Sequence, residues 1–472
     1  MRFRSRARLI TVLCVVAALA PPTAFAADRM WMGFHDDPMF RWNDERVAEL
    51  DRASAAGATL IRTLVTWANV APERPRKASN PFDPAYKLDD VDEIVRAAQA
   101  RGQEVLITIW GTPKWANGGK GPAFLPKKWG DFQNFTRALA SRYSGRYPGY
   151  PFVRFWGIWN ESNLGGFLSP QYNAKGAKIG PALYAKLAAA GYKGIKAGNR
   201  KALVAIGETS SHGLDKKRAG VTDSIRPGTF ARLVAAANKR LKFDAWAHHP
   251  YPYPVNMKAT QKVMWPNVNL SSLPRFETSL DQWFGRKNIP VWVTEYGHET
   301  RPADPNGVSE AQQALYVRQA ISMLKQDPRV PIFVWFVFRD SSGSLWQSGM
   351  YRANGRAKPA LSRYRAGATP LDMRNTVVTV KGGTKNPLVT AYVREFCANN
   401  AVGTPVGVNY RAFVGAKLMV VGQSSPKLAI DCTVRVRING LTVAKGTTAT
   451  VNLDLNTANG NGAVRTLAVV GS

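Results

Sequence analysis

Cysteine, histidine and acidic residues are all scarce in this chain. Three cysteines and five histidines occur in 472 residues, which excludes a small disulfide-rich scaffold. The few cysteines and histidines do not stand at the spacing of a zinc site, so we expect no bound metal. After residue 30 no apolar run is long enough to span a bilayer, so the mature chain is expected to have no membrane-spanning segment.

Basic residues outnumber acidic ones, with 64 lysines and arginines against 32 acids and a formal net charge of +32. Such an excess favours polyanionic partners, which include acidic polysaccharide, cell-wall polymer and nucleic acid. However, the basic residues are scattered, and neither a long Lys/Arg block nor a nucleic-acid-binding module is visible. We therefore expect no specific nucleic-acid partner, and a compositional bias toward Arg and Ala explains the charge equally well.

The N-terminus has the layout of a secretory signal peptide. Four arginines within the first eight residues precede an apolar stretch over residues 9–20, and Ala24-Phe25-Ala26 supplies small residues before a cleavage point. We expect residues 1–26 to be removed after Ala26, leaving a net charge of +28 and a secreted protein, extracellular or associated with the cell wall. An uncleaved membrane anchor is the less favoured alternative.

Removal of this leader takes Cys14 away and leaves Cys397 and Cys432. Two cysteines in an exported protein fit one disulfide bond. Closing the loop between them would stabilise the fold by about 3–4 kcal/mol. The bridge is expected to be structural, because neither cysteine lies near the candidate site described below.

Eight apolar segments rich in β-branched and aromatic residues alternate with helical patterns. The expected strands are Met30–His35, Leu60–Thr66, Glu104–Trp110, Val153–Asn160, Leu203–Gly207, Phe243–His249, Val291–Glu295 and Ile332–Phe338. The expected helices include Leu88–Arg101, Pro181–Lys196, Gly228–Arg240, Ser272–Arg286, Ser309–Lys325 and a short, weakly indicated one near Pro359–Ala366. Eight such repeats predict an α/β fold, a closed (β/α)₈ barrel over residues 27–368.

Beyond this region the pattern changes to short Val- and Thr-rich runs separated by turns. Residues 369–472 are therefore predicted to form a small all-β, sandwich-like accessory domain, with strands at Thr376–Val380, Leu388–Phe396, Val406–Phe413, Lys417–Val421, Thr433–Ile438 and Val451–Leu455. This domain either binds polymer or only caps the barrel. The second interpretation is favoured because its few aromatic residues stand mostly at core-like spacing.

Two short segments each end an apolar strand with a carboxylate. They are Gly157-Ile158-Trp159-Asn160-Glu161-Ser162 and Val291-Trp292-Val293-Thr294-Glu295-Tyr296-Gly297. A buried acid costs several kcal/mol unless it is paired or has a function. In a barrel of this type the carboxyl ends of the strands form the active site. We therefore expect Glu161 and Glu295 to meet there, at the same end as His35, Arg62, Trp110, Glu208, His248, His249 and Arg339.

The motifs Trp159-Asn160-Glu161 and Thr294-Glu295-Tyr296-Gly297 resemble those of retaining glycoside hydrolases of clan A, most closely families 5 and 39. The resemblance covers roughly residues 30–365. It implies a double-displacement mechanism with Glu161 as acid/base and Glu295 as nucleophile, and no metal or organic cofactor. It also implies that Asn160 binds the sugar 2-hydroxyl.

The same resemblance suggests further substrate-binding residues. Arg62 matches the arginine that hydrogen-bonds the nucleophile, and His249-Pro250-Tyr251 matches a His-x-Tyr motif whose tyrosine donates to it. Strand parity favours His249 over His248 as the inward residue, although a bulge would reverse the choice. Two tryptophans complete the set: Trp335 as the floor of the sugar site, with a core position as its alternative, and Trp115 in Thr112-Pro113-Lys114-Trp115-Ala116 as an outer platform, together with Trp67.

The chain departs from the family 5 pattern after Tyr296-Gly297, where His298-Glu299 replaces a frequent tryptophan. The catalytic machinery is therefore better indicated than the substrate, which we expect to be a poly- or oligosaccharide with β-type linkages, an acidic or cell-wall polymer being one option. Sugar, linkage, endo or exo action and oligomeric state stay open. Two alternatives remain: a non-catalytic carbohydrate- or cell-wall-binding protein on a glycosidase scaffold, and a metal-dependent hydrolase using His248, His249 and His298.

Overall fold

The computed structural model describes residues 30–344, 346–368, 376–393, 396, 400, 403–429, 433–456 and 462–472. The predicted signal peptide and the predicted Cys397–Cys432 disulfide lie outside these residues. In the described part of the chain, no helix combines the length and the apolar character needed to cross a membrane.

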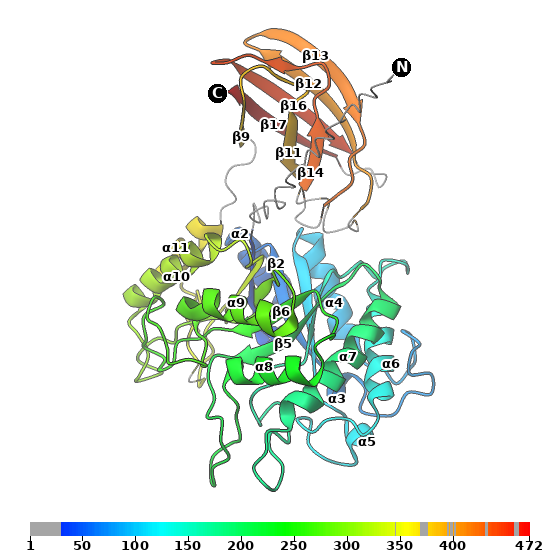
Figure 1. The fold of residues 1–472 in the computed structure, drawn as a ribbon, viewed down its shortest axis with the longest axis vertical. Coiled ribbons are helices and arrows are strands. Elements are labelled where there is room, and N and C mark those ends of the chain that lie inside the picture. The colour runs from blue at the N-terminus through cyan, green and yellow to red at the C-terminus, as the bar shows by residue number, and fades with distance from the viewer. Residues whose placement is uncertain are drawn as a thin grey trace, which may run out of the picture.

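Eight parallel strands close into a barrel in sequence order (Figure 1). They are β1 (Trp31–His35), β2 (Leu60–Thr66), β3 (Glu104–Trp110), β4 (Phe155–Ile158), β5 (Leu203–Ser210), β6 (Ala245–His249), β7 (Val291–Val293) and β8 (Ile332–Phe336). The predicted (β/α)₈ barrel is thus confirmed. β4 is shorter than predicted because Trp159 adopts a positive φ of 74°, which takes the backbone out of the extended region.

Helices surround the barrel and follow its strands. They are α1 (Asp37–Phe40), α2 (Arg46–Ala55), α3 (Trp67–Val70), α4 (Asp89–Ala100), α5 (Lys114–Asn117), α6 (Trp129–Arg142), α7 (Gly180–Gly198), α8 (Pro227–Ala237), η1 (Leu270–Ser272), α9 (Leu273–Phe284), α10 (Glu310–Lys325) and α11 (Pro359–Ala368). The local sequence accounts for their bounds. At α10, Ser309 and Gln312 form a capping box that satisfies two backbone N–H groups.

Large aromatic side chains fill the barrel near the N-terminal ends of its strands. Trp31 of β1, Phe155 of β4 and Trp292 of β7 lie on strands that are not neighbours. Their rings nevertheless meet edge to face, with centroid distances of 5.9 Å for Trp31–Phe155 and 5.4 Å for Phe155–Trp292. Such contacts are possible only across the interior. The barrel is therefore a packed core at this end, and the residues of the candidate site lie at the opposite end.

The C-terminal part consists of β-strands alone. They are β9 (Thr376–Val380), β10 (Thr384–Lys385), β11 (Leu388–Tyr392), β12 (Gly407–Val414), β13 (Lys417–Ser424), β14 (Thr433–Arg437), β15 (Thr442–Val443), β16 (Thr448–Asn456) and β17 (Gly462–Gly471). Five form one sheet in the order β13-β12-β16-β17-β9, and two pairs form β10-β15 and β11-β14. The sequence pattern predicted a small β-domain but not β10, β15 or β17.

One hydrophobic cluster joins the two parts of the molecule. It contains Trp31 and Trp292 from the barrel interior together with Val389 of β11 and Val434 of β14. Figure 1 shows the C-terminal sheets beyond one end of the barrel. The cluster also contains the aromatic plug, which is formed by Trp31, Phe155 and Trp292, so the sheets share their core with the end of the barrel opposite the candidate site. This arrangement supports the interpretation of the C-terminal part as a structural cap.

Candidate active site

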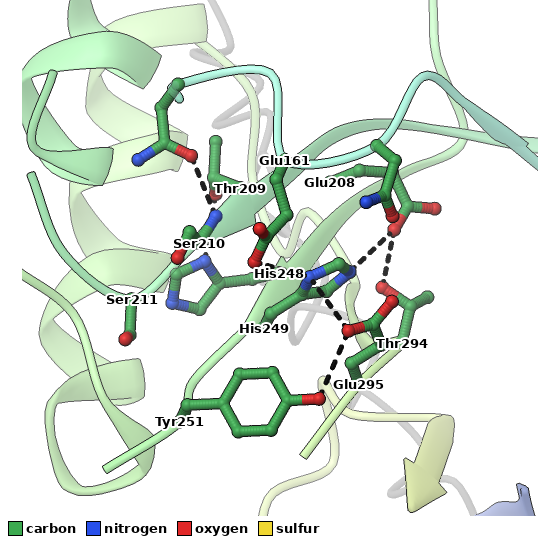
Figure 2. Close-up of polar contacts among 12 residues, drawn as sticks. Glu161, Glu208, Thr209, Ser210, Ser211, His248, His249, Tyr251, Thr294 and Glu295 are labelled. Atoms are coloured by element: carbon green, nitrogen blue, oxygen red, sulfur yellow. Dashed lines mark hydrogen bonds and ion pairs between the residues drawn. The ribbon is translucent and has the colours of Figure 1, made fainter. Parts of the chain in front are cut away.

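Glu161 follows β4 and Glu295 follows β7, and both line one pocket of about 500 Å³ at the C-terminal mouth of the barrel. His249 Nδ1 lies 3.3 Å from Glu161 Oε1 and 3.6 Å from Glu295 Oε2 (Figure 2). The two carboxylates therefore share one neighbour and cannot be far apart. A close pair of acids across a pocket is the arrangement that glycosidic bond cleavage requires.

The backbone turns sharply where the first acid is presented. Trp159 has a φ of 74° and Glu161 a φ of 38°, both in the left-handed region that non-glycine residues seldom adopt. Trp159 Nε1 donates to the carbonyl of Phe167 at 2.8 Å and so anchors the turn. Asn160 between them accepts a hydrogen bond from Arg62 Nη2 at 2.9 Å. The sequence Trp-Asn-Glu thus leaves the strand as a strained turn that directs two polar side chains toward the site.

Glu295 is surrounded by donors and positive charge. Arg62 Nη1 donates to Oε1 at 2.5 Å, and the Tyr251 hydroxyl donates to Oε2 at 3.1 Å. Burial alone would raise the pKa of Glu295, but the charges of His249 and Arg62 outweigh it and hold the pKa well below its usual range. The surroundings of Glu295 therefore favour its ionised form.

The structure decides between the two adjacent histidines. His249 is buried and points to the mouth of the barrel, whereas His248 faces outward, with Nδ1 2.8 Å from Thr209 Oγ1 and Nε2 2.9 Å from the carbonyl of Val268. Burial lowers the pKa of His248 to about 3. Burial also opposes the charge on His249, but Glu295, Glu161 and Glu208 raise its pKa to about 9. The residue favoured by strand parity is thus the one at the site.

Trp335 is placed differently from the sequence prediction. It is fully buried, its Nε1 donates to the carbonyl of Ser348 at 2.8 Å, and it belongs to the hydrophobic cluster outside the barrel interior. The next residue, Phe336, lines the pocket instead. The reason is the alternation of side chains along β8, because Ile332 and Val334 belong to the cluster inside the barrel and Phe336 follows in the same parity. Strand parity, counted from Phe336 as an inward residue, would have predicted that Trp335 faces away from the barrel interior.

Trp115 and Trp67 serve packing rather than an open platform. Trp67 is buried, and the Trp115 ring meets it edge to face at 5.5 Å. Trp115 Nε1 donates to the carbonyl of Ala71 at 2.8 Å, and Arg74 covers the ring at 4.4 Å. Neither tryptophan lines the pocket. The predicted outer platform is therefore not formed by these residues.

Other aromatic side chains, which the sequence analysis missed, form the walls. Trp346 meets Tyr251 at 5.3 Å and Phe336 at 5.5 Å, both edge to face. On another part of the wall, the Tyr253 ring stacks on His212 with centroids 4.0 Å apart. These residues lie in loops, where neither periodicity nor a motif marks a side chain as facing the site.

A second pocket of about 400 Å³ adjoins the first, since Leu64 lines both. Its wall includes Trp42, whose side chain is 60% exposed, together with Asn69 and Lys87. Arg41 fixes this wall by donating to Asp90 at 2.7 Å and to the carbonyl of Leu64 at 3.0 Å. An exposed indole with polar neighbours is a surface on which a sugar ring can stack.

Two of the three histidines considered for a metal lie away from the pocket. His248 faces outward, and His298 is buried with its Nε2 2.8 Å from the Tyr296 hydroxyl. In the described part of the chain, no three His, Cys, Asp or Glu side chains are grouped to hold a metal ion.

A closed barrel with two acids at its mouth, one of them stabilised by neighbouring charges, is the arrangement found in glycoside hydrolases. Residues 29–337 match the family model for cellulase (glycosyl hydrolase family 5), so the chain belongs to glycoside hydrolase family 5. No curated protein sequence matches it.

Solved structures with the same fold come from glycoside hydrolase families 5 and 39. A family 39 glycoside hydrolase of Bacteroides cellulosilyticus WH2 has a TM-score of 0.53 at 18% identity, covering 88% of this chain and 81% of that one. The GH5_18 protein of Streptomyces cattleya, solved with GlcNAc, has a TM-score of 0.50 at 15% identity, covering 75% and 85%. The GH5_18 protein of Bifidobacterium longum subsp. longum gives 0.50 and 15%, covering 75% and 84%.

Proposed function

We propose that this protein cleaves oligo- or polysaccharides by a retaining double displacement, with Glu295 as nucleophile and Glu161 as acid/base. The observation that supports it most is the environment of Glu295. Arg62, Tyr251 and His249 surround one carboxylate with donors and charge. Glu161 faces the same pocket, and 16% of its side chain is exposed.

In the first step a Glu295 oxygen attacks the anomeric carbon, and the bond from that carbon to the leaving oxygen breaks. Glu161, as the acid, gives its proton to this oxygen, so a free hydroxyl and a glycosyl ester on Glu295 result. In the second step Glu161, now a carboxylate, takes a proton from water. The water oxygen attacks the same carbon and releases Glu295 with the original anomeric configuration.

Asn160 is proposed to bind the sugar 2-hydroxyl during both steps. Its Oδ1 already accepts from Arg62, which leaves the amide N–H groups to face the pocket. A donor fixed in this way costs little reorganisation when charge develops on the ring. Arg62 thus orients the nucleophile and Asn160 together.

The pocket favours an uncharged sugar over an acidic one. Among its described lining residues there is no lysine or arginine, whereas Glu161, Glu295 and Glu299 bring carboxylates to it. A uronate or sulfate group there would lack a counter-ion and would face like charges. The overall excess of basic residues therefore does not extend to the lining of this pocket, and Arg62 behind it is already paired with Glu295, so we propose a neutral substrate.

The adjoining second pocket supports an oligosaccharide rather than a single sugar unit. It meets the catalytic pocket at Leu64, on the strand that carries Arg62, the partner of the nucleophile. The portion of the substrate that stays attached to Glu295 after the first step lies on this side of the catalytic pocket. We propose that the second pocket binds a further sugar of this same portion, stacked on Trp42.

We also propose that the protein is secreted, on the basis of the signal-peptide pattern in residues 1–26. The alternative is a non-catalytic carbohydrate-binding protein on this scaffold. It is less favoured, because both acids are present and the partners of Glu295 lie within hydrogen-bond distance of it.

The test is cleavage of a glycan panel by the mature protein, with neutral and uronate-containing oligosaccharides of increasing length, and NMR detection of the anomer released first. Glu161→Gln and Glu295→Gln should each lose activity by about a thousand-fold or more, because either change removes one of the two steps. Glu277→Gln, a buried glutamate on α9, is the matched control.

Three outcomes would count against parts of this proposal. Activity that survives in Glu295→Gln contradicts the nucleophile, and an inverted first product contradicts double displacement. Binding without cleavage across the panel favours the non-catalytic alternative. Preference for uronate-containing glycans contradicts the neutral substrate.

A further inference from the structure

A third buried carboxylate lies at the barrel mouth and takes no part in the two chemical steps. Glu208 is fully buried near the end of β5 and does not line the pocket. It therefore cannot reach a substrate. Burial would raise the pKa of Glu208, but the charges of Arg62 and His249 and the hydrogen bonds from His249 and Thr294 outweigh it and lower the pKa. A buried charge of this kind is costly unless it has a structural or functional role.

The backbone is distorted to place this side chain. The pairing of β5 with β6 shifts register between Gly207 and Thr209, and Glu208 between them has a positive φ of 44°. The side chain also needs an open space opposite, on β4. A Cβ on Gly157 would lie 2.2 Å from Glu208 Oε1, so only glycine leaves room there. The bulge, the strained backbone and the matching glycine together indicate that the barrel is adapted to hold the Glu208 side chain at this position.

The contacts of Glu208 lead to both catalytic acids. Its Oε2 accepts from Thr294 Oγ1 at 2.7 Å and lies 3.1 Å from His249 Nε2 (Figure 2). The same oxygen lies 3.4 Å from Arg62 Nη2. His249 in turn contacts Glu161 and Glu295, and Arg62 contacts Glu295. Glu208 is thus bonded to the two cations that contact the acids.

The geometry of the His249 ring specifies its charge. Nε2 lies 3.1 Å from Glu208, and Nδ1 lies 3.6 Å from Glu295 as well as 3.3 Å from Glu161, so an ionised carboxylate faces each ring nitrogen even while Glu161 holds the proton that it gives in the first step. A neutral imidazole has only one N–H, so its other nitrogen would present a lone pair to a carboxylate. A ring that carries both protons donates to each side.

We propose that Glu208 is a positioning residue that keeps the His249 ring oriented and doubly protonated between Glu161 and Glu295. The roles of those two acids rest on the proposed function, but the state of the ring does not. The groups that face the ring from the surrounding elements are Glu161, Glu208, Tyr251 and Glu295, with Arg62 bonded to two of them.

The chemistry gains from a fixed positive charge at this point. When Glu295 becomes a glycosyl ester it loses its negative charge, and the ring keeps Glu208 and Glu161 as partners. The Nδ1–H of the charged ring can then donate to Glu161, which is the carboxylate base of the second step. Without Glu208 the ring would lose its proton more easily at just this stage.

The test is a pH titration followed by NMR of the full protein carrying ¹⁵N-labelled histidine. The chain has five histidines, and the His249 signals are assigned by their loss in His249→Asn. In the unchanged protein this ring should hold both protons until about pH 9. In Glu208→Gln the midpoint should fall by about 1–3 units, the shift expected for loss of a close charge partner. Glu277→Gln should leave it unchanged.

Glu208→Asp serves as a second variant should glutamine prevent folding. Aspartate keeps the negative charge, but its shorter side chain places the carboxylate farther from His249 Nε2. We therefore expect a smaller downward shift of the His249 midpoint. A ring already neutral at pH 7 in the unchanged protein would overturn the proposal. So would an unaltered midpoint in a folded Glu208 variant. Because the readout needs no substrate, a glycan panel without cleavage would reject the proposed function and leave this result standing.

Discussion

Arg62 is a buried cation that contacts Glu208 and four other polar groups of the site. It donates to Thr108 at 3.0 Å, to Asn160 at 2.9 Å and to Glu295 at 2.5 Å, and it lies 2.7 Å from His35. Burial of an unpaired guanidinium would be costly, but here the fork of N–H groups is matched by acceptors. A lysine at this position would offer one point charge in place of the fork.

The close approach at Gly157 gives a prediction for stability. Gly157→Ala would bring a Cβ to 2.2 Å from Glu208 Oε1 and 2.8 Å from Thr108 Oγ1. Because both groups are bonded within the site, we expect a loss of about 1–3 kcal/mol in the free energy of unfolding, together with reduced activity. Denaturant unfolding measures the loss in the free energy of unfolding.

Gly130→Ala in α6 is the matched control for this change. No atom lies within 4 Å of a Cβ added there, and the residue is helical. Alanine is expected to leave stability unchanged or to raise it by up to about 1 kcal/mol. Equal stabilities of the two variants would contradict the tight fit around Glu208.

The raised pKa of His249 predicts a pH dependence of stability. The group has a pKa of 6.5 when unfolded and about 9 when folded. Its contribution is therefore fully present below pH 6.5 and is lost as the pH rises through about 9. We expect His249→Asn to destabilise the protein more at pH 6 than at pH 10, as measured by urea unfolding at both values. A destabilisation by His249→Asn that grows with pH would contradict a charged His249 ring.

At the scale of elements, the β-strands end where the functional residues begin. β4 ends at Ile158 and β7 at Val293, and the acids follow within three residues of each. The parallel arrangement collects all such ends at one face of the barrel. This explains why motifs far apart in the chain form one site.

The N-terminus of α10 gives a prediction at this scale that concerns stability alone. Ser309→Ala removes the capping box with Gln312 and should cost about 1 kcal/mol in the free energy of unfolding. Activity should stay unchanged, because neither residue lines the catalytic pocket. Ser322→Ala, at an exposed position within the same helix, is the control and should change stability by less than about 0.5 kcal/mol. An equal loss in both variants would argue against the cap.

At the scale of the whole molecule, the barrel and the C-terminal sheets depend on one apolar cluster. The aromatic plug of Trp31, Phe155 and Trp292 belongs to the same cluster as the buried valines of β11 and β14. The candidate site lies at the other end of the barrel. The sheets can therefore stabilise the enzyme without touching its substrate.

Truncation after residue 368, where α11 ends, tests this division. Removal of the sheets should expose the plug, so we expect a lower melting temperature and aggregation on heating. The turnover of the fraction that stays folded should change little. A truncated protein as stable as the full chain would contradict the structural role, and a selective loss of activity on polymers would favour polymer binding by the sheets.

Local sequence determined much of the architecture. Eight strand-and-helix units, the capping box before α10 and the two glutamates after β4 and β7 follow from periodicity, capping and motif, which involve residues close in the chain. The choice of His249 over His248 followed from strand parity. These features could be predicted because their causes are short-range.

The walls and the supporting charges of the site were decided by the tertiary structure. Whether Trp335 or Phe336 faces inward depends on the register of β8, and the loop positions of Trp346 and Tyr253 depend on packing between distant segments. Glu208 reaches Arg62 and His249 only because a bulge in β5 meets a glycine on β4. Its partners come from strands far apart in the sequence. Charge composition likewise could not show that a basic chain has a catalytic pocket lined by carboxylates, because composition carries no information about position.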